Sequence, residues 1–191
     1  MSPRTPQQLE LLRQERKAQI IEAALEVMAA EGYAHATMSQ VARTSGISKG
    51  LIYNYFESKE NLVEGILLFS LEELKKILGD IPETGLTPEK YIALIDKTFA
   101  MYRDKQVFWR MYIAVMLQEE PKRIVLRMLK GQEAHYFRPW VDYYTQKGHP
   151  DPMGMTLFAH AVFDGIMLNH LNQPELFPLE SLRPLVVQIL V

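Results

Sequence analysis

Hydrophobic positions recur at helical spacing along almost the whole chain, and the alternation typical of strands is scarce. The first such stripe is ended by Gly32 and consists of Ile20, Ile21, Ala24, Leu25 and Met28. The pattern therefore predicts an all-α protein whose first helix begins near residue 9 or 16 and ends near residue 30.

Two short helices and one longer helix are expected next. Thr37 and Ser48 each precede a short segment, 38–44 and 49–56, and Ser58 precedes a longer one at 59–78. A hydroxyl oxygen suits such positions because it accepts a hydrogen bond from a free amide in the first turn of a helix. The glycine between the two short segments favours a tight turn there.

Glycine, aspartate and proline cluster at residues 79–85 and mark the clearest break in the chain. Helices are expected after it at 88–103, 105–118, 121–147, 152–172 and 178–190, with Pro139 bending the third of these. The sequence thus predicts an N-terminal unit of residues 1–60, a connecting helix at 59–78 and a larger helical unit of residues 80–191.

The segment from residue 38 to residue 55 has the spacing of a helix-turn-helix. A small residue, Ala42, precedes Gly46 by four positions, and Ile52 follows six positions later, which suits two short helices packed across a turn. An ordinary helical hairpin would show the same three positions. DNA binding is favoured because the second helix begins with Ser48-Lys49-Gly50 and carries further polar side chains.

The charge balance depends on where the charges lie. The net charge is −2, and residues 1–60 hold seven basic and seven acidic side chains. Between Glu31 and Glu57, however, the only formally charged residues are Arg43 and Lys49, both positive. Phosphate binding depends on the charge that faces DNA, so a neutral unit can present a positive surface.

Several function classes are disfavoured. The chain has no cysteine, which excludes disulfides and cysteine-based zinc sites and fits a reducing, cytoplasmic location. It has no apolar run of membrane-spanning length and no apolar core typical of a signal peptide near its start. His160 and Asp164 share a helix face, but a metal site needs more converging ligands, and no catalytic spacing is present. No metal, cofactor, membrane contact or enzyme activity is expected.

Residues 16–62 resemble the DNA-binding signature of the TetR family of transcriptional regulators. The resemblance is carried by Thr37-Met38-Ser39-Gln40-Val41-Ala42, by Gly46-Ile47-Ser48-Lys49-Gly50-Leu51-Ile52-Tyr53-Asn54-Tyr55-Phe56 and by Ser58-Lys59-Glu60-Asn61-Leu62. It implies a three-helix DNA-binding domain followed by a helical ligand-binding and dimerisation domain. It also implies a repressor that a small apolar or aromatic ligand releases from a near-palindromic operator.

The resemblance assigns roles to single residues. It implies phosphate contacts by Thr37, Lys49, Tyr53 and Lys59, a place at the groove wall for Tyr55, and positions nearest the bases for Ser48, Gly50, Leu51 and Asn54. Leu51 departs from the family, in which this position is more often small or polar. Leu51 either contacts a thymine methyl group or reaches no base, and Asn54 is suited to adenine or to a phosphate.

Methionine and aromatic residues are frequent beyond residue 88. Such residues build helical cores more often than pockets, but they also suit an adaptable cavity for an apolar ligand. The resemblance favours an effector pocket, with these candidate residues: Phe99, Trp109, Tyr112, Met116, Tyr136, Trp140, Phe158 and Met167. The alternative is an architectural or cell-division DNA-binding protein of the same fold without an effector.

The last two expected helices are apolar on nearly all sides, so each must be buried on more than one face. Pairing of these helices with their copies would bury them in a four-helix arrangement, which predicts a homodimer. Burial within one chain is the alternative. The candidate interface residues are Phe158, Val162, Gly165, Leu182, Val186 and Ile189. The expected partners are therefore double-stranded operator DNA, a second copy of the chain and an unidentified small-molecule effector.

Overall fold

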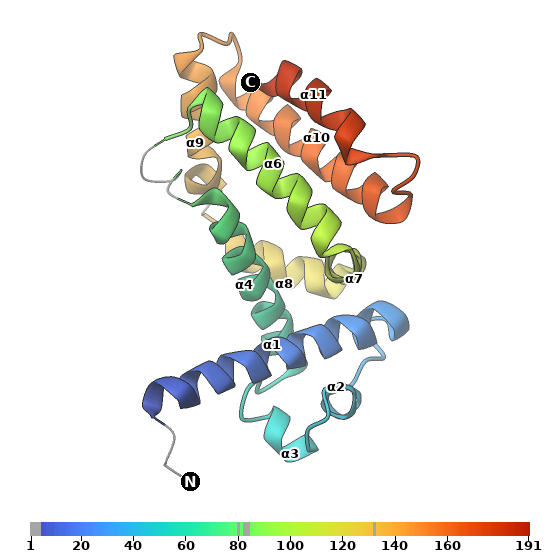
Figure 1. Cartoon of the computed structure of the whole chain (residues 1–191). Helices are drawn as coiled ribbons and strands as arrows, with labels where there is room; N and C mark the ends of the chain where they lie inside the picture. The colour runs from blue at the N-terminus through green and yellow to red at the C-terminus, as the bar shows by residue number, and fades with distance from the viewer. Residues whose placement is uncertain (1–4, 80, 82–84, 132) are drawn as a thin grey trace. The chain divides into compact units, whose positions relative to one another are not determined.

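The computed structural model describes residues 5–79, 81, 85–131 and 133–191. Every regular element in these ranges is a helix, which confirms the all-α prediction (Figure 1). The chain divides into two compact units. The first contains residues 1–71 and 111–128, and the second contains residues 72–110 and 129–191.

The first unit contains the short helices expected from the sequence. Its N-terminal helices are α1 (Pro6–Glu31), α2 (Met38–Thr44), α3 (Lys49–Ile52) and the first part of α4 (Lys59–Leu78). The bounds predicted for α2 and α4 are confirmed, whereas α3 ends four residues before the predicted limit of residue 56. Helix α1 begins earlier than expected because Thr5 and Gln8 form a capping box at its start.

A small apolar core holds these helices together. The C-terminal half of α1 contributes the predicted stripe, which packs with the buried residues Val41, Ala42, Ile52, Phe56, Leu62, Val63 and Ile66. The N-terminal half of α1 behaves differently, since residues 6–17 are exposed to solvent. Only the second half of this helix is therefore part of the core, and the first half projects from it.

The observed units differ from the division expected at residue 60, because residues 111–128 belong to the first unit. This stretch contains most of α7 (Gln106–Met116) and α8 (Glu119–Leu129). Gln118, between these two helices, accepts a hydrogen bond from the Tyr33 amide at 2.5 Å and donates one to the Met28 carbonyl at 3.2 Å. Arg127 also pairs with Glu60. These contacts connect segments that are far apart in sequence.

The single helix expected at residues 121–147 is wrong. The structure has two helices there, α8 and α9 (Glu133–Gln146). The break contains Gly131, whose φ of 83° lies in the left-handed region that favours glycine. Pro139 lies inside α9, as expected.

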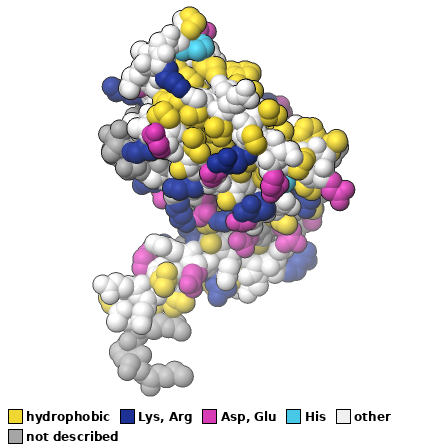
Figure 2. Space-filling view, turned by 45° about the horizontal axis from the view of Figure 1, so that its top comes forward, with side chains coloured by type: hydrophobic (Ala, Val, Ile, Leu, Met, Phe, Trp, Pro, Cys, Tyr) yellow, Lys and Arg dark blue, Asp and Glu magenta, His cyan; other side chains and the backbone are white. Residues whose placement is uncertain are grey.

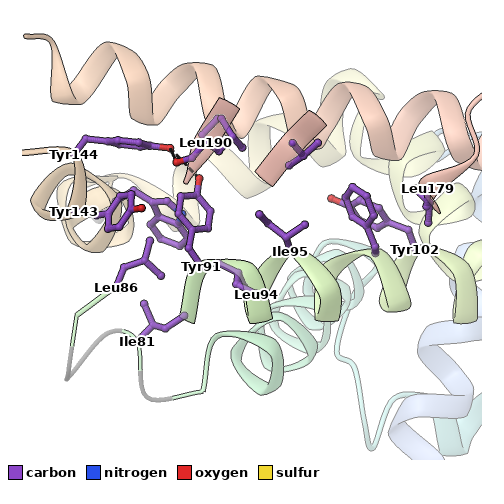
Figure 3. Close-up of a cluster of buried hydrophobic side chains, with 14 residues drawn as sticks. Ile81, Leu86, Tyr91, Leu94, Ile95, Tyr102, Tyr143, Tyr144, Leu179 and Leu190 are labelled. Carbon is purple, nitrogen blue, oxygen red and sulfur yellow. Dashed lines mark hydrogen bonds between the residues drawn. The ribbon is translucent and has the colours of Figure 1, made fainter. Parts of the chain in front are cut away.

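The second unit contains α6 (Pro88–Asp104), α9, α10 (Pro152–Asn172) and α11 (Leu179–Leu190). Helix α10 packs along α9, and α11 packs along α6 (Figure 1). Aliphatic and aromatic side chains from all four helices form the core (Figure 3). None of the helices in the described ranges has the length and apolarity needed to cross a membrane.

A chain of hydroxyl groups fixes one end of this core (Figure 3). The Tyr91 hydroxyl lies 3.1 Å from that of Tyr144, which donates to the Leu190 carbonyl at 3.1 Å. Burial raises the pKa of both Tyr91 and Tyr144 above the ordinary tyrosine value. Both hydroxyls therefore remain protonated and link α6, α9 and α11.

Replacing Tyr144 with phenylalanine should lower the free energy of unfolding by about 1–3 kcal/mol. The change removes the acceptor of the fully buried Tyr91 hydroxyl and the donor to Leu190. Urea unfolding measures the loss. Tyr143→Phe is the control, because Tyr143 donates only to the Val191 carbonyl and its loss leaves no buried hydroxyl unpaired. Equal losses in the two variants would contradict this account.

Candidate nucleic-acid interface

Helices α2 and α3 form the turn that the sequence pattern predicts. The Ile47 amide donates to the Ala42 carbonyl at 2.9 Å, and Gly46 has a φ of 69°. Ala42 and Ile52 are both buried, so the small side chain lies in the core and the aliphatic one anchors α3. The buried side chain of Ile52 thus anchors α3, while the other residues of α3 stay exposed.

Helix α3 presents almost all of its side chains to solvent. The Ser48 hydroxyl caps it by accepting from the Leu51 amide at 3.2 Å. The side chain of Ile52 is buried. The exposed residues of α3 and of the two positions after it are Lys49, Gly50, Leu51, Tyr53 and Asn54. One ammonium group, one phenol, one amide and one aliphatic side chain thus lie on a short, anchored segment. Such a set can contact phosphates and base edges.

Thr37 lies at the start of α2, and its hydroxyl is already used there. It accepts from the Gln40 amide at 3.2 Å and donates to the Gln40 side-chain oxygen at 2.6 Å. The Gln40 side chain in turn accepts from the Thr37 amide at 2.8 Å. Thr37 is exposed, but this capping box engages the hydroxyl that was expected to hold a phosphate.

The structure gives Lys59 a different role from the phosphate contact expected for it. Its ammonium group donates to the carbonyl oxygens of Tyr33 at 2.5 Å, Ala34 at 3.2 Å and Ala36 at 3.0 Å. The same group lies 4.3 Å from the centre of the Tyr33 ring. An ammonium group has three donors, and all three are engaged here. Lys59 therefore holds the loop before α2.

The electrostatics of that loop follow from its neighbours. Burial raises the pKa of the Tyr33 phenol, and the negative charges of Glu60 and Glu120 raise it further. Tyr33 thus stays neutral and offers its ring face to the Lys59 ammonium group.

A groove beside the helix-turn-helix was missed by the sequence reasoning. It has a volume of about 310 Å³ and is lined by Glu10, Arg13, Gln14, Lys17 and Tyr55. The four residues from α1 follow the spacing i, i+3, i+4 and i+7, which places them on one face of that helix. Tyr55, which was expected at the groove wall of DNA, forms the opposite side and is partly buried.

The residues expected to line an effector pocket differ in burial and do not all belong to the same unit. Phe99 and Trp140 belong to the core of the second unit, and Trp109 is buried as well. Tyr112 and Met116 belong to the first unit. In the second unit Tyr136 and Phe158 are exposed and Met167 is partly buried. Phe99, Trp109 and Trp140 thus have the packing of core residues.

The residues expected at a dimer interface divide in a similar way. Val186 is only 4% exposed and packs into the core of the second unit, so placing it at an interface was wrong. Phe158 and Ile189 are about half exposed, at 49% and 56%. The remaining three are partly buried: Val162, Gly165 and Leu182. In the described part of the chain, no cluster of three or more side chains could hold a metal ion.

Comparison with known proteins places the N-terminal segment. Residues 20–66 match the family of bacterial regulatory proteins of the tetR type. The matched stretch covers the core half of α1, all of α2 and α3 and the start of α4. These residues form a DNA-binding domain of the TetR family.

Two curated relatives show how far this chain can be aligned. The fatty acid metabolism regulator protein of Bacillus subtilis is 33% identical over 84 residues, which are 44% of this chain and 43% of that protein. The match thus spans less than half of that relative. The regulator BetI 1 of Chromohalobacter salexigens is 25% identical over 179 residues, or 89% of this chain and 86% of that protein.

Solved structures extend the likeness in fold to the whole chain. A transcriptional regulator from Pseudomonas aeruginosa PAO1 superimposes with a TM-score of 0.73 at 19% identity, over 93% of this chain and 89% of that chain. The fatty acid degradation regulator FadR from Bacillus halodurans gives a TM-score of 0.69 at 23% identity, over 91% of this chain and 96% of that chain. Both units thus follow one known fold.

Proposed function

We propose that the chain is a transcriptional repressor that binds a near-palindromic operator as a homodimer. One observation supports this most directly: α3 is anchored by the buried side chain of Ile52 and exposes Lys49, Leu51, Tyr53 and Asn54 around it. In a helix-turn-helix this second helix enters the major groove. Lys49 and Tyr53 contact phosphates, while Leu51 and Asn54 meet base edges.

The second unit supports the homodimer. Helices α10 and α11 both pack on α6, and each also carries exposed apolar side chains. We call these the α10–α11 face: Leu157, Phe158, Leu168, Leu185 and Ile189. Hydrophobic side chains are plentiful on the surface of this unit (Figure 2). A second copy of the chain would cover the face, since large exposed apolar patches mark interaction sites.

Two-fold symmetry sets how such a dimer reads DNA. Two copies of α3 about 34–36 Å apart would enter successive major grooves on one side of the duplex. An effector lowers operator affinity when it binds more tightly to a conformer with another spacing. Helix α4 runs from the first unit into the second and is the segment that transmits this change.

For the effector we propose an apolar molecule with a long acyl chain. The Bacillus subtilis relative is named a fatty acid metabolism regulator, and a solved structure of FadR from that organism contains stearoyl-CoA. The aromatic and methionine side chains of the second unit suit an apolar chain. Stearoyl-CoA added to the protein–operator complex should release the DNA. Equal affinity of stearoyl-CoA for free and DNA-bound protein would contradict release by this effector.

In vitro selection from a random duplex library tests the DNA-binding function. The selected sequences should contain two related half-sites about 10 base pairs apart, centre to centre, or a multiple of that spacing. Enrichment of no sequence, with uniform binding to all duplexes, would instead support an architectural DNA-binding protein without an operator.

Lys49→Ala should weaken binding to operator and to random DNA by similar factors, because a phosphate contact carries no sequence information. The slope of log K against log salt should also fall by about 0.9 for each phosphate that the lysine no longer neutralises. Fluorescence anisotropy over a salt series measures both effects. Leu51→Ala is the matched change on the same helix and should alter the preferred base at one position instead. A Lys49→Ala defect confined to operator DNA would contradict the phosphate role.

A further inference from the structure

The N-terminal half of α1 is a regular, capped helix that does not serve the core. Thr5 and Gln8 close its first turn, and residues 6–17 are exposed. In Figure 1 this half extends beyond the part of α1 that lies over α2 and α3. The ordering of an exposed helical extension costs conformational entropy that no buried contact offsets.

One face of this extension borders the groove defined above. Its charged residues are Glu10, Arg13 and Lys17, and Tyr55 lies across from them. Gln14 donates to the Glu10 carboxylate at 3.2 Å, so both stay in place on that face. The Lys17 ammonium group lies 5.5 Å from the centre of the Phe56 ring. This directs Lys17 toward the segment that follows α3.

The two cations of the groove are available for a partner. Among the described residues, no carboxylate forms an ion pair with Arg13 or Lys17. The groove is therefore positive by one charge, with Glu10 as the single acidic group on its wall. Charged walls make it a poor site for an apolar effector, but suit a chain of phosphate groups.

The groove also continues the surface proposed to bind DNA. Tyr55 follows directly after the exposed Tyr53 and Asn54, so the groove begins where the surface of α3 ends. When α3 lies in the major groove of a duplex, the duplex continues beyond the C-terminal end of the α3 surface, and its sugar–phosphate strands lie on the outside. The occupant with the right charge, shape and position is one strand of the same duplex.

We propose that the groove between α1 and Tyr55 holds the sugar–phosphate strand that flanks each half-site. Arg13 and Lys17 pair with its phosphates, and Tyr55 lies against its sugars. Glu10 repels the strand and limits the affinity for DNA of any sequence. This inference rests on the proposed function, because it needs α3 to lie in a major groove.

The test measures binding of the full-length protein to its selected operator in two duplexes. One duplex ends at the outer edge of each half-site, and the other carries ten further base pairs on each side. On the longer duplex, Arg13→Gln and Lys17→Gln should each weaken binding roughly 2- to 30-fold, since each change removes two exposed charge contacts per dimer. Each change should also reduce the salt slope by about 1.8. On the shorter duplex they should match the unchanged protein.

Glu10→Gln supplies a test of opposite sign. It should strengthen binding to the longer duplex, because it removes a negative charge from the groove that holds the strand. Arg16→Gln and Glu15→Gln are the matched controls, since these residues lie on the same exposed stretch of α1 but do not line the groove. On the longer duplex, Arg16→Gln should change the affinity less than Arg13→Gln does, and Glu15→Gln should change it less than Glu10→Gln does.

The outcomes separate this inference from the proposed function. Unchanged salt slopes for Arg13→Gln and Lys17→Gln, in a protein that still selects its operator, would overturn the groove contact alone. Absence of any selected operator would overturn the proposed function first. Equal effects of the substitutions on the short and long duplexes would also overturn the inference, because the strand would then lie elsewhere.

Discussion

Replacing Phe158 with aspartate should leave the chain monomeric and weaken operator binding by about a hundred- to ten-thousand-fold. Phe158 is 49% exposed on α10, and Leu157 and Ile189 of the same α10–α11 face are exposed to a similar degree. A carboxylate buried in an apolar interface without a partner strongly opposes association. A monomer carries only one DNA-binding domain, so the gain in affinity from binding both half-sites with one dimer is lost.

Sedimentation equilibrium and fluorescence anisotropy check the two parts of this prediction. Leu126→Asp is the control, because Leu126 is 63% exposed on α8 in the first unit and is not one of the residues of the α10–α11 face. Leu126→Asp should therefore remain a dimer and bind the operator with the affinity of the unchanged chain. A Phe158→Asp protein that stays dimeric at micromolar concentration would show that the interface lies on another surface.

Features set by neighbours in the sequence could be predicted well. The starts of α2 and α4 follow from the hydroxyl before each helix, and the turn between α2 and α3 follows from Gly46. These signals depend on a few adjacent residues and on backbone geometry. The exposed set on α3 could be predicted for the same reason, because a helix with one apolar anchor leaves its other side chains in water.

Features set by distant contacts could not be predicted. Nothing near Gln118 in the sequence indicates that its amide bonds to Met28 and Tyr33, so the division expected from the sequence differs from the observed units at residues 111–128. The pattern around Val186 shows an apolar helix but not which of its sides faces the core of its own chain. Only three-dimensional packing separates core residues from those left for a partner.

Two errors had a visible signal. Lys130-Gly131 lies within the segment expected to be one helix, and a glycine there is a common point of termination. The spacing of Glu10, Arg13, Gln14 and Lys17 likewise defines a polar face before the apolar stripe of α1 begins. Both signals are local, because each depends only on residues that are close together in the sequence.

Replacing Lys59 with methionine should lower the free energy of unfolding of the first unit by about 2–3 kcal/mol. Methionine keeps most of the apolar stem of lysine but removes the three hydrogen bonds to Tyr33, Ala34 and Ala36. Hydrogen bonds to a charged group contribute more than neutral ones, and the freed carbonyls recover part of this through water. The attraction between the ammonium group and the Tyr33 ring disappears as well.

Urea unfolding of the free protein, followed by a salt series on DNA, distinguishes this role from a phosphate contact. Lys59→Met should unfold at lower urea concentration and, while folded, keep the salt slope of the unchanged protein. Lys49→Met is the matched control: Lys49 is exposed on α3, so its loss should change stability by less than about 0.5 kcal/mol and reduce the salt slope. If Lys59→Met reduced the slope without loss of stability, Lys59 would contact DNA, and the loop before α2 would be held by other groups.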